Sequence, residues 1–169
     1  MEYTIRPTRL EDMEGFNILR RMPGVFENTL GLPSERVERN IDGFQAMGPD
    51  DHNFVAVLAD GTVIGTAGLR VCPNPRMRHV GSVGLFVHTA YQNMGVGAAL
   101  LKTLLDLADN WLMLVRVELE VFADNQRAIH LYEKLGFETE GRKRMSCVRS
   151  GRYADELLMA RLRPGVEGR

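Results

Sequence analysis

A glycine-containing turn stands where a β-rich run gives way to a leucine-rich helical pattern. The run ends with Leu85, Phe86 and Val87, and the turn consists of Gln92, Asn93, Met94, Gly95, Val96, Gly97 and Ala98. A helix start exposes backbone N–H groups that lack intrahelical partners, and glycine lets a phosphate approach the backbone closely. The turn is therefore a candidate anion site. Many strand-to-helix turns contain two glycines for steric reasons, so the pattern alone is not specific.

Two well-known phosphate motifs do not account for this turn. The Gly95-Val96-Gly97 sequence begins like a dinucleotide fingerprint but lacks its third glycine. It also follows a series of hairpin strands rather than opening a βαβ unit, and no acidic residue stands at a strand end ~20 residues on. No Gly-Lys-Ser/Thr sequence follows, which excludes a P-loop.

A second segment, Asn125 to Phe137, supplies polar and aromatic side chains on a predicted helix. Together the two segments resemble the GNAT family of acyl-CoA N-acyltransferases. The family's Gln/Arg-x-x-Gly-x-Gly/Ala signature is matched by Gln92, Gly95 and Gly97. Its later signature is matched by Asn125, Ala128, Leu131, Tyr132, Gly136 and Phe137. The resemblance covers about residues 1–162 and implies acetyl-CoA as co-substrate, with no metal ion.

The resemblance also implies specific contacts with acetyl-CoA. The backbone of residues 85–87 would pair with the pantetheine arm, the amides of residues 93–98 would hold the pyrophosphate, and Asn125 would fix the cofactor near its reactive end. The expected cofactor-binding residues are Leu85, Phe86, Val87, Gln92, Asn93, Met94, Gly95, Val96, Gly97, Ala98, Asn125 and Tyr132. Lys134 is either a further phosphate contact or a solvated helix residue.

Direct acetyl transfer needs a neutral amine to attack the thioester and a group to stabilise the leaving thiolate. Tyr132 is the expected acid, because the family's tyrosine at this place lies near the sulfur. A tyrosine pKa of ~10 against ~8.5 for a thiol makes full proton transfer uphill by roughly 2 kcal/mol. We therefore expect Tyr132 to donate a strong hydrogen bond to the thiolate, with its proton passing to the sulfur only late in the reaction.

Glu120 is the candidate general base. It lies five places before Asn125, at a position that relatives acetylating protein N-termini use as a base, and shares a strand face with Glu118. Both glutamates could instead be solvated or paired with arginines. His79, His88 and a chain of water molecules are the alternatives for the proton. Covalent catalysis by Cys147 is disfavoured because no His or acidic residue is positioned by sequence to activate it.

The acceptor is expected to be the α-amine of a free amino acid or an amino-acid analogue. The segments 27–30, 109–112 and 153–161 resemble the branch of the family that acetylates free amino acids. The candidate acceptor-site residues are Phe26, Thr29, Arg76, Arg78, Arg149, Tyr153 and Asp155. A protein N-terminus or a polyamine is the alternative acceptor, and a non-catalytic acyl-CoA-binding module is the alternative of another class.

The chain has 169 residues, which suits one domain. We expect that domain at residues 1–163, followed by a loose tail at 164–169. A net charge of −1 makes nucleic acid and membrane surfaces unfavoured partners. The two cysteines are far apart in the sequence and predict neither a disulfide framework nor a zinc site. No apolar run predicts a signal peptide or a membrane span. We therefore expect a cytoplasmic location. Dimers are common in the family, but no feature identifies an interface, so a homodimer stays open.

Hydrophobic patterning predicts an α+β fold with about six to seven strands and four helices. Helices are expected from Leu10 to Leu19 with Thr8 as cap, from Ser34 to about Ala46 with Ser34 as cap, from Ala98 to Leu107, and from Asn125 to Leu135. Strands are expected at 3–6, 54–58, 63–69, 80–87, 115–122, 137–145 and 153–162. The resemblance implies a mixed, mostly antiparallel sheet splayed into a V-shaped acyl-CoA cleft.

Overall fold

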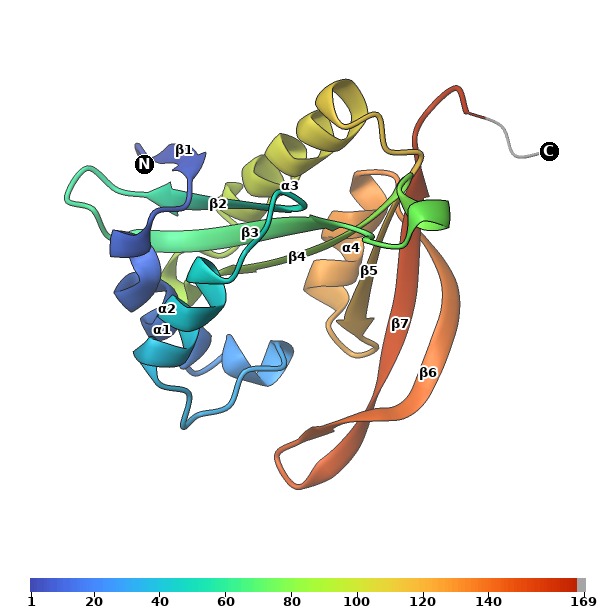
Figure 1. The fold of residues 1–169 in the computed structure, drawn as a ribbon. Coiled ribbons are helices and arrows are strands. Elements are labelled where there is room, and N and C mark those ends of the chain that lie inside the picture. The colour runs from blue at the N-terminus through green and yellow to red at the C-terminus, as the bar shows by residue number, and fades with distance from the viewer. Residues whose placement is uncertain (167–169) are drawn as a thin grey trace. The chain divides into compact units, whose positions relative to one another are not determined.

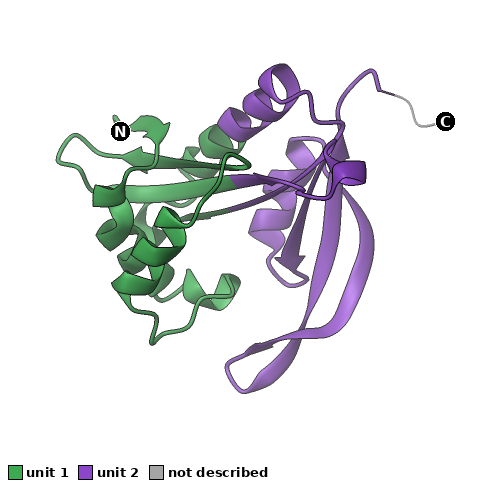
Figure 2. Cartoon of the chain, in the orientation of Figure 1, with its two compact units in different colours: residues 1–68, 85–101 green, residues 69–84, 102–169 purple. Residues whose placement is uncertain are grey.

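The computed structural model describes residues 1–166 (Figure 1). Its contacts group the chain into two compact units (Figure 2). Unit 1 contains residues 1–68 and 85–101, and unit 2 contains residues 69–84 and 102–169. The prediction of one domain over residues 1–163 is not tested by this grouping. The predicted tail falls partly on residues 167–169, which lie outside the described residues.

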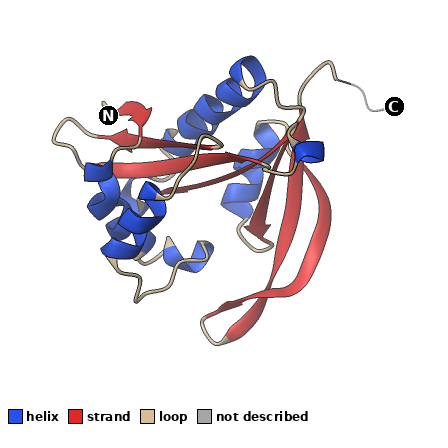
Figure 3. Cartoon of the chain, viewed as in Figure 1, coloured by secondary structure: helices blue, strands red, loops and turns tan. Residues whose placement is uncertain are grey.

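Within residues 1–166 the fold contains seven strands and four α-helices (Figure 3). The strands are β1 (Thr4–Pro7), β2 (Asp51–Val57), β3 (Val63–Val71), β4 (Val80–Val87), β5 (Arg116–Phe122), β6 (Glu138–Arg149) and β7 (Arg152–Leu162). The helices are α1 (Met13–Arg20), α2 (Val37–Gln45), α3 (Val96–Asp106) and α4 (Gln126–Lys134). The strand order β1-β2-β3-β4-β5-β7-β6, with both parallel and antiparallel pairs, confirms the predicted mixed sheet.

In unit 1, β1 pairs antiparallel with β2, and the apolar side chains of β2, β3 and α1 form a core. Leu19, Val55, Val57 and Val63 are buried in it, and Phe86 packs against them. The predicted Asp60-Gly61 turn joins β2 to β3, and Gly61 takes a φ of 86°, which glycine adopts without a side-chain clash. This core fixes the end of β4 and α1 within one body.

The predicted helix caps at Thr8 and Ser34 are both wrong. A short 3₁₀ turn, Leu10–Asp12, precedes α1, and the Asp12 carboxylate accepts the Arg9 N–H at 2.7 Å. Helix α2 begins only at Val37 and has no side-chain cap. The reason is tertiary, because the Glu35 carbonyl accepts a hydrogen bond from Asn17 of α1 and holds the segment before α2 out of the helix.

In unit 2, β5 lies between β4 and β7. It pairs parallel with β4 over three residue pairs, the last being Ser82 with Glu118, and antiparallel with β7 over its whole length. Strand β6 runs to Arg149 rather than to Met145 as predicted, because it contains a bulge in which Lys143 faces Glu156 while Cys147 faces Ala154.

Among the described residues, no helix is both long enough and apolar enough to cross a bilayer.

Candidate active site

The predicted phosphate turn in unit 1 is held by backbone geometry and one side chain. The Gln92 amide donates to the Val87 carbonyl oxygen at 2.9 Å, which ties the turn to the end of β4. Asn93 and Gly95 take positive φ angles of 59° and 86°. The Ala99 N–H bonds the Gly95 carbonyl at 2.9 Å, so Gly95 is the residue at which α3 begins its hydrogen bonding.

This geometry fits a bound anion. The amides of Val96, Gly97 and Ala98 precede the first bond of α3, and the first N–H groups of any helix lack intrahelical acceptors. A side chain added at Gly95 would meet no atom within 4 Å, so the turn faces open space there. Free N–H groups and the positive end of an eleven-residue helix can hold a pyrophosphate without a basic side chain.

The strand segment expected to pair with pantetheine comes just before the turn. The His88 N–H donates to the Ile64 carbonyl of β3 at 2.9 Å, which fixes the end of the strand. The Phe86 ring makes an edge contact with the Phe16 ring of α1, with centroids 5.4 Å apart. The His88 ring nitrogen Nδ1 accepts the Ala90 N–H at 3.1 Å, so that nitrogen is occupied by a local turn.

Unit 2 carries the second motif on α4. Asn125 is the N-cap of this helix, and its side-chain oxygen accepts the Ala128 N–H at 3.3 Å. The cap leaves the Asn125 side-chain NH₂ as the group that could contact a cofactor. Tyr132 follows two turns later on the same helix. The cap and the tyrosine are therefore positioned by one element.

Tyr132 is almost completely buried, with 6% of its surface exposed. Its ring packs against Phe137 with centroids 5.7 Å apart. Burial raises the pKa of the Tyr132 hydroxyl to about 12. None of the described residues forms a hydrogen bond with this hydroxyl. The group therefore stays protonated at neutral pH and can donate a hydrogen bond to a ligand.

Glu120 has a different environment from Tyr132. Its side chain is 44% exposed and forms an ion pair with Lys143 at 2.9 Å. This pairing raises the pKa of Lys143. Glu118, on the same strand face, pairs with Arg116 at 2.8 Å. Both glutamates thus have cationic partners, and Glu120 remains a prediction as the base.

Glu156 is a buried carboxylate of unit 2 that the sequence reasoning missed. Only 5% of the residue is exposed, and it accepts a hydrogen bond from the Ser146 hydroxyl at 2.9 Å. Burial first, and the hydrogen bond to Glu156 second, raise the pKa of the Cys147 thiol. A thiol with a raised pKa is a poor nucleophile, which agrees with the expectation against covalent catalysis.

The predicted acceptor residues of unit 2 are largely engaged in other contacts. Arg149 forms an ion pair with Asp124, and its guanidinium lies 4.7 Å from the centre of the Phe122 ring. Asp155 accepts hydrogen bonds from Arg142 and from the Met145 N–H, which hold the β6 bulge.

Of the remaining predicted acceptor residues, Arg76 is exposed, and its backbone N–H donates to the Asn74 side-chain oxygen at 3.0 Å. Arg78 donates to the Cys72 carbonyl at 3.3 Å, and Tyr153 is 72% exposed. In unit 1, Phe26 begins a 3₁₀ turn, and the Thr29 hydroxyl bonds the Phe26 carbonyl at 3.4 Å.

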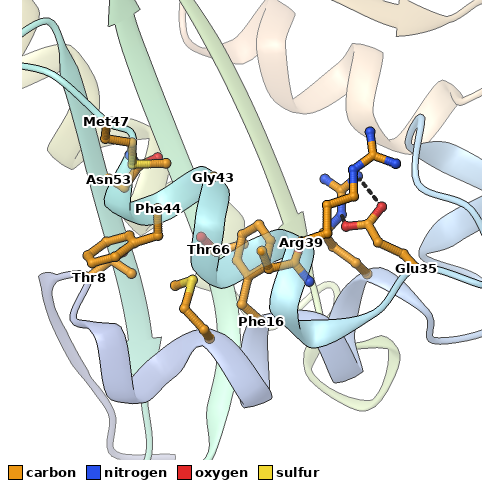
Figure 4. Close-up of a pocket in the computed structure, with 12 residues that line it drawn as sticks. Thr8, Phe16, Glu35, Arg39, Gly43, Phe44, Met47, Asn53 and Thr66 are labelled. Atoms are coloured by element: carbon orange, nitrogen blue, oxygen red, sulfur yellow. Dashed lines mark hydrogen bonds and ion pairs between the residues drawn. The ribbon is translucent and has the colours of Figure 1, made fainter.

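Unit 1 contains a cavity of about 250 Å³ between α1, α2 and the strands beneath them (Figure 4). Phe16, Phe44 and Thr66 contribute to its walls, and Arg20, Glu35 and Arg39 line it as well. Arg20 and Glu35 form an ion pair at 2.7 Å. The sequence offered only the Glu35 and Arg39 spacing of four, typical of an intrahelical pair. The structure instead pairs Glu35, which precedes α2, with Arg20 of α1.

Comparison with known proteins places this site in a family. Residues 16–137 match the model of the acetyltransferase (GNAT) family. The chain is 37% identical over 166 residues to the L-amino acid N-acetyltransferase AaaT of Escherichia coli, covering 96% of this chain and 99% of the relative. It is 37% identical over 115 residues to the N-alpha-acetyltransferase RimI of Mycobacterium tuberculosis, covering 67% of each.

A solved structure agrees with these sequence matches. The acetyltransferase of the GNAT family from Streptococcus pneumoniae superposes with a TM-score of 0.79 at 26% identity, covering 95% of this chain and 99% of that one. Both signatures predicted from the sequence lie within the matched region. The chain belongs to the GNAT family of acetyltransferases and uses acetyl-CoA as its acetyl donor.

Proposed function

We propose that the chain transfers the acetyl group of acetyl-CoA to the α-amine of a free amino acid or amino-acid analogue. The observation that carries this proposal is the match to the amino-acid acetyltransferase, which covers 96% of this chain and 99% of the relative. The match therefore extends over almost the whole chain rather than over the two cofactor motifs alone. The RimI match covers only 67% of each chain.

The cofactor is held by two groups of residues in this proposal. In unit 1 the amides of Val96, Gly97 and Ala98 bind the pyrophosphate, and the backbone of residues 85–87 pairs with pantetheine. In unit 2 the Asn125 side-chain NH₂ contacts the arm near the thioester. Backbone amides supply the positive potential, so binding does not need a basic surface on a chain of net charge −1.

Chemistry proceeds by direct transfer. The neutral amine attacks the thioester carbon, and the resulting tetrahedral adduct collapses to amide and thiolate. Tyr132 donates a hydrogen bond to the departing sulfur. The proton lost by the amine passes to Glu120 or through water to solvent. Holding both reactants in one site can supply up to about 7–11 kcal/mol of the barrier reduction.

Acetylation of a protein N-terminus is the second candidate, favoured by the identity to RimI over two thirds of the chain. A thiol-release assay with acetyl-CoA and a panel of amino acids, short peptides and spermidine separates the candidates. We expect turnover with free amino acids. Turnover confined to peptides would favour the second candidate, and CoA binding without turnover on any amine would indicate a non-catalytic module. Cytoplasmic location and a homodimer stay predictions.

A further inference from the structure

Lys143 places a primary amine against the residue proposed as the general base. Its Nζ atom donates a hydrogen bond to Glu120 Oε2 at 2.9 Å. A base that takes a proton directly from the acceptor must lie within about 2.6–3.2 Å of the acceptor nitrogen. The chain therefore holds one of its own amines at the distance from Glu120 that an acceptor amine must reach.

The contact between Lys143 and Glu120 is made across a whole strand. In the strand order, β7 lies between β5 and β6 (Figure 1). Glu120 of β5 lies opposite Leu158 of β7, and Lys143 of β6 lies opposite Glu156 of β7. The two side chains therefore extend toward each other over β7. The lysine amine is brought to Glu120 by the pairing of three strands and not by closeness in the sequence.

The backbone near Lys143 is held firmly, whereas its amine is accessible. The β6 bulge begins after Lys143, and Asp155 holds it through hydrogen bonds from the Arg142 guanidinium and the Met145 N–H. The Lys143 side chain itself is 48% exposed. Exposed ion pairs contribute little free energy, so the amine can leave Glu120 and return to it.

The charges around Lys143 oppose its reaction with reagents in solution. Its amine faces Glu120 of β5, Glu156 of β7 and Cys147 of its own strand. The hydrogen bond to Glu120 is the main cause that raises the pKa of Lys143, and the negative charges of Glu120 and Glu156 add to it. Only a neutral amine is nucleophilic, so Lys143 should react slowly with acetyl-CoA unless the site assists it.

Two other lysines provide an internal comparison. Lys102 and Lys134 are the remaining lysines of the chain, and both are exposed. Neither forms an ion pair with a described residue. Uncatalysed acetylation should therefore favour these two over Lys143, whereas acetylation within the site should favour Lys143.

We propose that Lys143 is a self-acetylation site, to which the chain transfers the acetyl group of acetyl-CoA when no free acceptor is present. The transfer occurs within one chain, because Glu120 and Lys143 belong to the same unit. Acetylation turns the ammonium into a neutral amide and releases Glu120 from its ion pair. The inference rests on the proposed function, with Glu120 as the base and Tyr132 acting on the sulfur.

The reaction balances without a further reagent. The Lys143 ammonium first loses one proton through Glu120 to solvent. The neutral Nζ then forms a bond to the thioester carbon, the C–S bond breaks, and CoA leaves as a thiolate that accepts a hydrogen bond from Tyr132. The second amine proton passes to Glu120, and the thiolate takes up a proton from solvent. The products are acetyl-lysine, the CoA thiol and one proton.

The site is tested by peptide mapping. The chain is first treated with a lysine deacetylase and then incubated with isotopically labelled acetyl-CoA and no acceptor. Lys143 should gain label at least about 10-fold faster than Lys102 or Lys134, because its amine is held in the site. The labelling rate should rise with pH, because the neutral amine is the nucleophile. Saturation with the amino acid that is turned over fastest should suppress the labelling, since both amines need Glu120.

Variants show whether the site catalyses this labelling. Tyr132→Phe should slow it about 10- to 150-fold, as for kcat, and Glu120→Gln should slow it about 100-fold. Glu118→Gln is the matched control, because Glu118 shares the strand face but pairs with Arg116. It should label normally. Equal labelling in all three variants would show uncatalysed acetylation and overturn the proposal.

A mixing experiment tests transfer within one chain. The unsubstituted chain is incubated with the Tyr132→Phe chain, which differs from it in mass by one oxygen atom. The variant should gain no more label at Lys143 than it does alone. Rapid labelling of the variant would show transfer between chains and would overturn the proposed route.

The release of Glu120 is tested by steady-state kinetics. Lys143→Gln resembles acetyl-lysine in charge, whereas Lys143→Arg keeps the cation and cannot be acetylated. The KM for the amino acid should be about 3-fold lower in Lys143→Gln and in the acetylated chain than in Lys143→Arg, because an exposed ion pair no longer competes for Glu120. Equal KM values would overturn the release of Glu120.

The outcomes separate this inference from the proposed function. If free amino acids are acetylated while Lys143 gains label no faster than Lys102 and Lys134, the inference fails and the proposed function stands. If Lys143 is labelled in a reaction that needs Glu120 while no free amino acid is acetylated, the inference stands and the proposed acceptor fails.

Discussion

Replacing Tyr132 by phenylalanine removes only the hydroxyl that we propose acts on the leaving thiolate. The ring remains to pack against Phe137. Because no described residue bonds the hydroxyl, its removal breaks no protein hydrogen bond. We therefore expect a melting temperature within about 2 °C of the unsubstituted protein, which corresponds to a stability change below about 1 kcal/mol.

The size of the catalytic effect follows from the raised pKa of Tyr132. At about 12, this pKa exceeds that of an ordinary thiol, about 8.5, by roughly 3.5 units. Full proton transfer from Tyr132 to the thiolate would then be uphill by about 5 kcal/mol. Tyr132 therefore acts as a hydrogen-bond donor, and a hydrogen bond to a charged group contributes about 1.5–3 kcal/mol. Its loss should lower kcat by about 10- to 150-fold.

The assay is steady-state thiol release at saturating acetyl-CoA, with the melting temperature measured in parallel. Tyr3→Phe, in a tyrosine outside the proposed site, is the matched control and should retain full turnover. Near-normal kcat in Tyr132→Phe would refute the assignment of Tyr132. A large drop in melting temperature would instead show that the hydroxyl has a structural role.

Three further predictions concern carboxylates and a thiol. Glu120→Gln should lower kcat/KM about 100-fold and remove the acidic limb of the pH profile of kcat/KM. The stability of the protein should change little, because the ion pair of Glu120 with Lys143 is exposed. A pH profile that does not change would exclude Glu120 as the base. Cys147→Ala should keep kcat within about 3-fold of the unsubstituted protein. In the unsubstituted protein, peptide mapping should find slow alkylation of Cys147 at neutral pH, because burial raises the pKa of its thiol. A trapped acyl-thioester on Cys147 would contradict direct transfer. For Asp12, burial acts to raise the pKa, but the hydrogen bonds from Arg6 and Arg9 outweigh it and lower the pKa. The ionised Asp12 carboxylate therefore stabilises the fold at any pH above its pKa in the unfolded chain, and this stabilisation is lost as the pH falls through its lower pKa in the folded chain. Asp12→Asn should lower the free energy of unfolding, measured by urea titration, by about 2 kcal/mol at pH 7 and by less near pH 3. An equal loss at the two pH values would refute the charge argument.

The sequence predicted those elements whose determinants are local. Strand alternation and the Asp60-Gly61 turn predicted β2 and β3, and the apolar stripe after the glycine turn predicted α3. The second motif predicted α4 to within one residue at each end, because Asn125 caps this helix with its own side chain. In each case the residues that decide the conformation are neighbours in the chain.

Predictions failed where a distant contact decides the outcome. Ser34 has the right chemistry for a cap, but the bonds of Glu35 to Asn17 and Arg20 delay the start of α2. The buried position of Glu156 depends on its register opposite Phe122 of β5. Patterning of β7 alone cannot supply that register, since it depends on pairing with another strand.

The second motif makes physical sense as a device that fixes one hydroxyl. Asn125 starts the helix through its bond to the Ala128 N–H, which sets the rotation of α4 and hence the direction of Tyr132. Gly136 ends the helix at a φ of 88°, a conformation that favours glycine. The turn lets the Phe137 N–H bond the Tyr132 carbonyl at 3.1 Å and brings the Phe137 ring against the Tyr132 ring. The same packing that orients the hydroxyl also removes water from it, and this desolvation raises its pKa to about 12. The orientation and the raised pKa of the Tyr132 hydroxyl thus have one structural cause, so a variant that loosens Phe137 should change both together.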